Sequence, residues 1–184
     1  LAAEKAAIRK LVVETKRPYL GICLGHQLLA EAIGGQVALA ERAKVGVMPV
    51  SMTPAGRADP FFRRLADPLT VLQWHSAEVR SLPPAAEVLA WSDACRVQAF
   101  RYGAHAFGLQ YHVQDTGDTA SEWAVIPAYA VALEKMLGAG AVHALRQAAA
   151  ENLPDFNRDA RFLYENFMSL IRAKSADKPN KEAH

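Results

Sequence analysis

Hydrophobic and polar positions change their period along this chain, and the changes mark its predicted elements. Residues 2–14 place their apolar side chains on one face, which predicts a helix. A short apolar run over residues 19–22 ends in a glycine-flanked turn, and residues 24–33 return to helical spacing before a glycine pair. The first 35 residues are therefore predicted to form helix, strand, sharp turn and helix.

The middle of the chain is typical of strands and the last third of helices. Short β-like runs, separated by Pro and Gly, occupy residues 36–40, 45–52, 69–74, 87–91, 97–102 and 106–113. We expect the first two of these runs to pair with each other, and the last two to form a hairpin. Helical spacing predicts helices over residues 119–137, 141–152 and 159–173. We expect one domain over residues 1–173 and a disordered polar tail over 174–184.

Composition excludes several classes of function. The chain has 184 residues, of which 51% are hydrophobic, enough for the core of one domain. Its net charge is +2 and its positive residues are scattered, which gives no support for nucleic-acid binding. No apolar run is long enough to span a membrane. No metal-ligand motif, P-loop or dinucleotide fingerprint is present, so we expect no metal and no cofactor. Two cysteines make no disulfide framework, which favours a reducing cytoplasm.

The sharp turn carries the most informative residue, Cys23. It lies between Gly21 and Gly25, where a strand meets a helix, which is the layout of a nucleophile elbow with cysteine in place of serine. A helix N-terminus favours thiolate over thiol, so we expect a lowered thiol pKa. The amide of Leu24, directly after the nucleophile, is the natural donor to an oxyanion. The alternative is an inert buried cysteine at a strand end.

A candidate base lies far along the chain, at the end of the 106–113 run. His112 and Gln114 share one side of a strand because side chains alternate with period 2. One imidazole nitrogen can then take the thiol proton while the other donates to the Gln114 oxygen.

These segments together resemble one known family. Residues 21–27 (GICLGHQ), Trp74–Ser76 and residues 108–114 (GLQYHVQ) are similar to the class I glutamine amidotransferase domain, particularly to its stand-alone, GMP synthase-like branch. The resemblance covers about residues 1–170. It implies a three-layer α/β sandwich of the flavodoxin-like kind with a mainly parallel sheet.

The resemblance also implies a reaction. Cys23 would attack the side-chain amide of glutamine and form a γ-glutamyl thioester, with His112 moving the protons. Gln27 would hold the substrate, and the backbone around Ser76 and Ala77 would face its α-amino and α-carboxylate groups. If a synthase partner exists, the ammonia would pass to it directly.

The chain departs from the family pattern at the third residue of the triad. The family has glutamate there, and this chain has Gln114. An amide cannot supply the negative charge that stabilises imidazolium, although a preformed thiolate–imidazolium pair would reduce that need. We expect activity weakened by about one to three powers of ten rather than abolished. Two alternatives stay open: a γ-glutamyl hydrolase acting on another γ-linked amide, and a catalytically weak regulatory or binding homologue.

The start of the chain is the second departure. The family fold begins with further strands and a glycine-rich loop that supplies a second oxyanion amide, and no Gly-Gly precedes Cys23. We therefore expect that an N-terminal part of the domain is missing from this sequence.

Four other residues invite a functional interpretation. We expect Cys95 to be structural, His26 to be a packing residue and His105 to be exposed at a turn. His75 either lines the substrate pocket or caps a strand.

Overall fold

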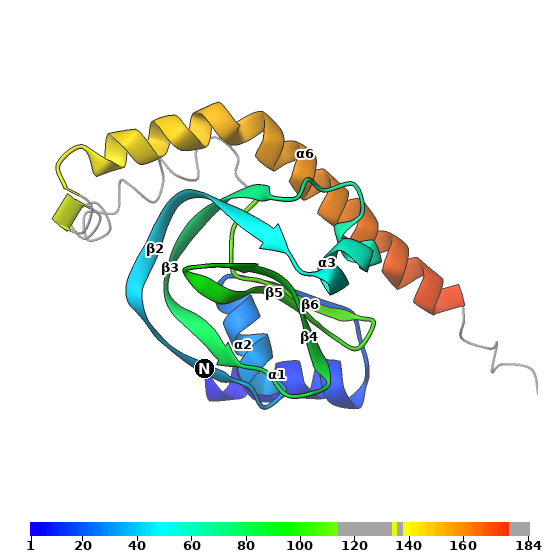
Figure 1. The fold of residues 1–184 in the computed structure, drawn as a ribbon. Coiled ribbons are helices and arrows are strands. Elements are labelled where there is room, and N and C mark those ends of the chain that lie inside the picture. The colour runs from blue at the N-terminus through cyan, green and yellow to red at the C-terminus, as the bar shows by residue number, and fades with distance from the viewer. Residues whose placement is uncertain (114–133, 136–137, 177–184) are drawn as a thin grey trace, which may run out of the picture.

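A six-stranded sheet runs through the computed structural model, which describes residues 1–113, 134–135 and 138–176 (Figure 1). Its order is β1-β6-β5-β4-β2-β3. The strands are β1 (Tyr19–Ile22), β2 (Gln36–Met52), β3 (Leu69–Ser81), β4 (Ala86–Ser92), β5 (Cys95–Tyr102) and β6 (Ala106–Leu109). The long strands β2 and β3 pair in antiparallel fashion and curl away from the other strands.

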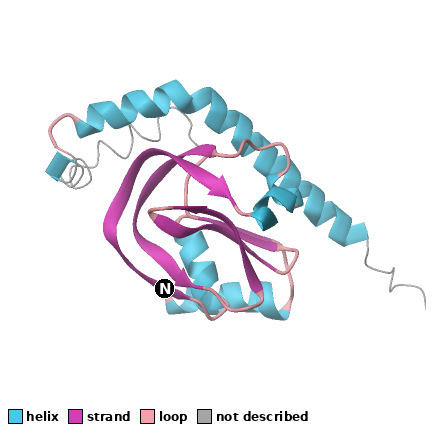
Figure 2. Ribbon diagram, in the orientation of Figure 1, coloured by secondary structure: helices cyan, strands magenta, loops and turns pink. Residues whose placement is uncertain are grey.

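Helices lie on both faces of the sheet (Figure 2). On one face, α1 (Ala2–Arg9) continues into the π-helical turn η1 (Lys10–Glu14) and lies beside α2 (Leu24–Ala32). The long helix α6 (Ala141–Ala176) crosses the other face, together with the short elements α3 (Pro54–Ala58) and η2 (Pro60–Phe62). The three layers confirm the predicted α/β class.

Strand β6 is buried on both sides, which is why all four of its residues are apolar. Phe107 and Leu109 point toward the core that α6 covers, whereas Ala106 belongs to the core beneath α1 and α2. On the α6 face the rings of Phe61, Phe107 and Phe167 pack on one another. This buried strand leads directly into the segment of residues 110–113.

A buried amide fixes α6 to the loop after η2. Asn166 is 2% exposed, and its Nδ2 atom donates to the carbonyls of Phe61 at 3.0 Å and Arg63 at 2.7 Å. Each bond satisfies a carbonyl that the helix would otherwise shield from water.

The sheet is mixed rather than mainly parallel. Among the described strands, only β1 and β6 pair in parallel, with Tyr19 opposite Ala106 and Ile22 opposite Leu109. The other pairs are antiparallel. Among them, β4, β5 and β6 follow one another through tight turns that reverse the chain.

Other element predictions also need correction. Residues 36–40 and 45–52 belong to one strand, β2, which pairs with β3 and not with itself. Residues 141–152 and 159–173 lie in one helix, α6, which contains Pro154. The helix predicted over residues 119–137 lies almost wholly outside the described residues, and Gln114 lies wholly outside them.

Candidate active site at the strand-to-helix turn

Cys23 occupies a strained turn between β1 and α2. Its backbone has φ 51° and ψ −103°, a region that residues with a side chain rarely adopt. Hydrogen bonds on both sides hold it there: its N–H donates to the Leu109 carbonyl at 2.8 Å, and its own carbonyl accepts from the Gln27 N–H at 3.2 Å. The predicted elbow geometry is present, imposed by the adjoining strand and the first turn of α2.

The Cys23 sulfur is half-buried between two polar groups. Its thiol donates to the carbonyl of Trp74, with 3.9 Å between sulfur and oxygen. The Nε2 atom of Gln110 donates to the sulfur, also at 3.9 Å. Burial raises the thiol pKa of Cys23, and the Leu24 backbone N–H opposes that rise. The expected lowering is therefore not found, because desolvation outweighs the favourable helix terminus. A thiol in this state needs a base when it reacts.

His112 lies at the same edge of the sheet as Cys23. Both follow the carboxyl ends of neighbouring parallel strands, since Ile22 of β1 pairs with Leu109 of β6. Two backbone hydrogen bonds join His112 to Leu72 of β3. The His112 N–H donates to the Leu72 carbonyl at 2.8 Å, and the Leu72 N–H donates to the His112 carbonyl at 3.1 Å. The backbone of His112, the predicted base, is thus fixed at the edge of the sheet where Cys23 lies. Gln114 lies outside the described residues.

The predicted substrate-binding residues lie together beside the elbow. Gln27 donates from Nε2 to the Ala77 carbonyl at 2.9 Å and to Gln110 Oε1 at 3.1 Å. Ser76 is exposed, whereas the Ala77 carbonyl also accepts from the His75 ring at 3.0 Å. Leu24 is 51% exposed at the start of α2.

Gln110 is a residue of this site that is not among those predicted from the sequence. This residue is fully buried and bridges Cys23 and Gln27. Its signal was present in the period-2 pattern, because residue 110 falls on the same side of an extended segment as residue 112.

Two buried histidines, His26 and His75, lie on the elements that carry the site. His26 is fully buried on α2, its ring 4.9 Å from that of Phe100, and burial lowers its pKa to about 3. His75 is 5% exposed, bonds to Ala77 and Gln73, and also has a lowered pKa because of burial. The packing role expected for His26 agrees with this placement.

His105 is buried rather than exposed. Its Nε2 atom lies 2.9 Å from the Val12 carbonyl, so the turn before β6 is fixed to η1. Cys95 is 2% exposed, and burial raises its pKa to about 11, which agrees with a structural role.

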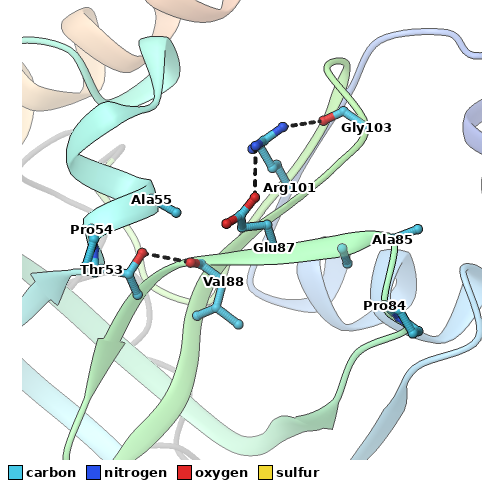
Figure 3. A pocket seen from close by; sticks show the side chains of 10 residues that line it. Thr53, Pro54, Ala55, Pro84, Ala85, Glu87, Val88, Arg101 and Gly103 are labelled. Atoms are coloured by element: carbon cyan, nitrogen blue, oxygen red, sulfur yellow. Dashed lines mark hydrogen bonds and ion pairs between the residues drawn. The ribbon is translucent and has the colours of Figure 1, made fainter.

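A cavity of about 630 Å³ lies away from the elbow, beside α3 and the start of β4 (Figure 3). Arg101 is its cationic lining residue, and Glu87 at 3.0 Å, Asp59 at 2.9 Å and the Gly103 carbonyl at 3.3 Å already bind its guanidinium. Thr53 is likewise used, since its hydroxyl donates to the Val88 carbonyl at 2.8 Å. We assign this cavity no part in the chemistry.

Two features are absent from the part of the chain that the structure describes. No group of three or more His, Cys, Asp or Glu residues there could hold a metal ion. Within the same residues, no helix combines the length and the apolar character needed to cross a membrane.

An α/β domain with cysteine on a strained strand-to-helix turn defines a nucleophile-elbow protein. The sequence model of the family described as glutamine amidotransferase class-I matches residues 2–120, more than half of the chain. The chain therefore belongs to the class I glutamine amidotransferase family, which confirms the resemblance seen in its motifs.

Curated relatives show the same relationship. The glutamine amidotransferase-like protein YfeJ of Salmonella typhimurium is 37% identical over 114 residues, 62% of this chain and 47% of the relative. One subunit of the glutamine-hydrolyzing GMP synthase of Methanothermobacter thermautotrophicus is 40% identical over 96 residues, 52% of this chain and 50% of the relative. The chain spans about half the length of these relatives.

Solved structures agree on the fold. A glutamine amidotransferase of Thermotoga maritima matches with a TM-score of 0.77 and 30% identity, covering 90% of this chain and 68% of that one. A glutamine amidotransferase of Methylobacillus flagellatus has a TM-score of 0.76 at 24% identity, covering all of this chain and 73% of that one, and supports the fold alone.

Proposed function

We propose that this chain hydrolyses the side-chain amide of glutamine to glutamate and ammonia through a γ-glutamyl thioester on Cys23. The observation that carries the proposal is the elbow: φ 51° at Cys23 presents its sulfur at the start of α2. The family to which the chain belongs, and relatives named as parts of a glutamine-hydrolyzing enzyme, support glutamine as the substrate.

The raised thiol pKa of Cys23 determines how the first step would run. Because the resting sulfur is protonated at neutral pH, His112 takes the thiol proton as the sulfur attacks the amide carbon. The Leu24 N–H stabilises the oxyanion, and His112 then gives its proton to the departing ammonia. Water hydrolyses the thioester, with His112 as base. Gln27 holds the substrate.

Gln114 would orient His112 but leave its positive charge without a carboxylate. That deficiency matters more when the ion pair is not preformed, so Gln114→Glu is expected to raise the rate by about one to three powers of ten. We further propose that the ammonia passes to a synthase partner, as the relatives from GMP synthase suggest.

Ammonia release from glutamine tests the proposal, measured for the parent, Cys23→Ala and Gln114→Glu. Activity that disappears in Cys23→Ala and rises in Gln114→Glu is expected. A parent without activity, not rescued by Gln114→Glu, would contradict it. A parallel assay with other γ-glutamyl amides would then detect a γ-glutamyl hydrolase, and the absence of all turnover would favour a binding homologue.

A further inference from the structure

Gln110 lies between Cys23, the proposed nucleophile, and Gln27, the residue proposed to hold the substrate. It follows β6 immediately, its side chain is fully buried, and its own N–H donates to the Gln98 carbonyl at 2.8 Å. Its carboxamide meets the Cys23 sulfur at 3.9 Å on one side and the Gln27 amide at 3.1 Å on the other. The backbone bond and the burial leave this side chain little freedom.

A backbone carbonyl determines which end of the Gln110 amide meets the sulfur. The Ala77 carbonyl can only accept, so the Gln27 atom 2.9 Å from it must be the NH₂ group. That same NH₂ group faces Gln110, which must therefore turn its oxygen toward Gln27. The NH₂ group of Gln110 is left facing Cys23.

The two ionisation states of the sulfur need different neighbours. In the thiol, the S–H group points to the Trp74 carbonyl, an acceptor that offers nothing to an anion. Once the proton has moved to His112, the negative charge on sulfur needs donors, because the half-buried sulfur is only partly solvated. Hydrogen bonds to an ionised acceptor are about twice as strong as neutral ones.

We infer that Gln110 is a further catalytic residue of this site, whose NH₂ group stabilises the Cys23 thiolate and whose oxygen holds Gln27 in place. The inference rests on the proposed function, since it concerns the nucleophile of that reaction. Gln110 keeps its hydrogens throughout: the thiol proton goes to His112, and the sulfur lone pair forms the bond to the amide carbon.

The test is the pH midpoint of Cys23 alkylation by iodoacetamide, measured by peptide mass spectrometry so that Cys95 is counted separately. Gln110→Met removes the NH₂ donor and keeps about the same side-chain volume. We expect its midpoint about one pH unit above that of the parent, a tenfold smaller thiolate fraction at neutral pH. Gln98→Met is the matched control, because Gln98 is also fully buried but bonds to Gln73 and Ser92. Its midpoint should equal that of the parent.

Two more variants keep the test decisive if Gln110→Met does not fold. Gln110→Glu has the same shape and retains an oxygen toward Gln27, but it puts a second oxygen against the sulfur. We expect an upward shift at least as large. Gln27→Met frees the Gln110 amide to turn, and we expect a smaller upward shift.

Unchanged midpoints in folded Gln110 variants would overturn the inference, because a residue that only fills space would leave the thiol ionisation unaltered. The proposed function fails separately, through the absence of ammonia release by the parent. Alkylation needs no substrate, so the two failures are distinguishable.

Discussion

Gly21 and Gly25 face each other across the elbow so closely that a Cβ on Gly21 would lie 2.4 Å from the carbonyl oxygen of Gly25. The Tyr19 hydroxyl donates to that same carbonyl at 3.1 Å, so the oxygen cannot simply turn aside. A Cβ on Gly25 would meet nothing closer than the Tyr19 hydroxyl, at 3.4 Å. The two glycines that flank Cys23 in the sequence thus have different structural roles.

We expect Gly21→Ala to destabilise the protein by about 2–4 kcal/mol, because strand and helix must separate to admit the methyl group. Gly25→Ala is the matched control and should change stability by less than about 1 kcal/mol, since alanine favours the helix. Urea unfolding followed by circular dichroism gives both values. Equal losses in the two variants would contradict the role given to Gly21.

The elbow could be predicted from the sequence because seven adjacent residues encode it. The contacts that complete the site could not, since Gln27 meets Ala77 and Gln110 across 50 and 83 residues. The raised thiol pKa was missed for the same reason: it depends on how much of the fold covers Cys23.

The two cysteines should differ in reactivity. Cys23 is half-buried, whereas Cys95 is 2% exposed with a pKa raised to about 11. We expect iodoacetamide to modify Cys23 first, with a pH midpoint above the ordinary thiol value of about 8.5 but below that of Cys95. In urea, both should react alike near the ordinary value. Modification of folded Cys95 before Cys23 would show that the burial differs from that described.

Whether a segment forms a helix or a strand could be predicted from the sequence more often than where that element begins and ends. Residues 41–44 are largely polar and lie between the strands predicted over 36–40 and 45–52. In the structure β2 continues through a register shift between Leu39 and Lys44, because β3 supplies a partner on both sides of it. Pro154 lies between the two helices predicted over residues 141–152 and 159–173, yet α6 continues through it. In β2, a contact distant in sequence outweighs a local signal.

The amide of Asn166 makes a second testable contribution to stability. Asn166→Leu keeps the side-chain size but leaves the carbonyls of Phe61 and Arg63 without their donor. We expect a loss of about 1–3 kcal/mol in the free energy of unfolding, the cost of buried unsatisfied groups. Asn152→Leu removes a bond to Ala148 within the same helix and should cost less than about 1 kcal/mol. Urea titration of the two variants separates docking of α6 from helix formation.

Acid stability should depend on His26. Its folded pKa of about 3 lies below the ordinary value of 6.5, so the unfolded chain binds a proton that the folded chain cannot. The free energy of unfolding should therefore fall as the pH drops from 6.5 toward 3, by about 1.4 kcal/mol per pH unit for this group. His26→Phe keeps a ring against Phe100 and should remove that slope.

Comparing the parent with His26→Phe isolates this group, because the other shifted groups are common to both. His75, whose pKa burial also lowers, adds a slope of the same sign, while the buried carboxyls of Asp59 and Asp159 have raised pKa values and act in the opposite direction. His143→Gln, at an exposed position of α6, serves as the control for replacing a histidine. Urea unfolding at half-unit steps between pH 4 and 8 makes the measurement. Parallel curves for the parent and His26→Phe would mean that the folded protein protonates His26 as readily as the unfolded chain does.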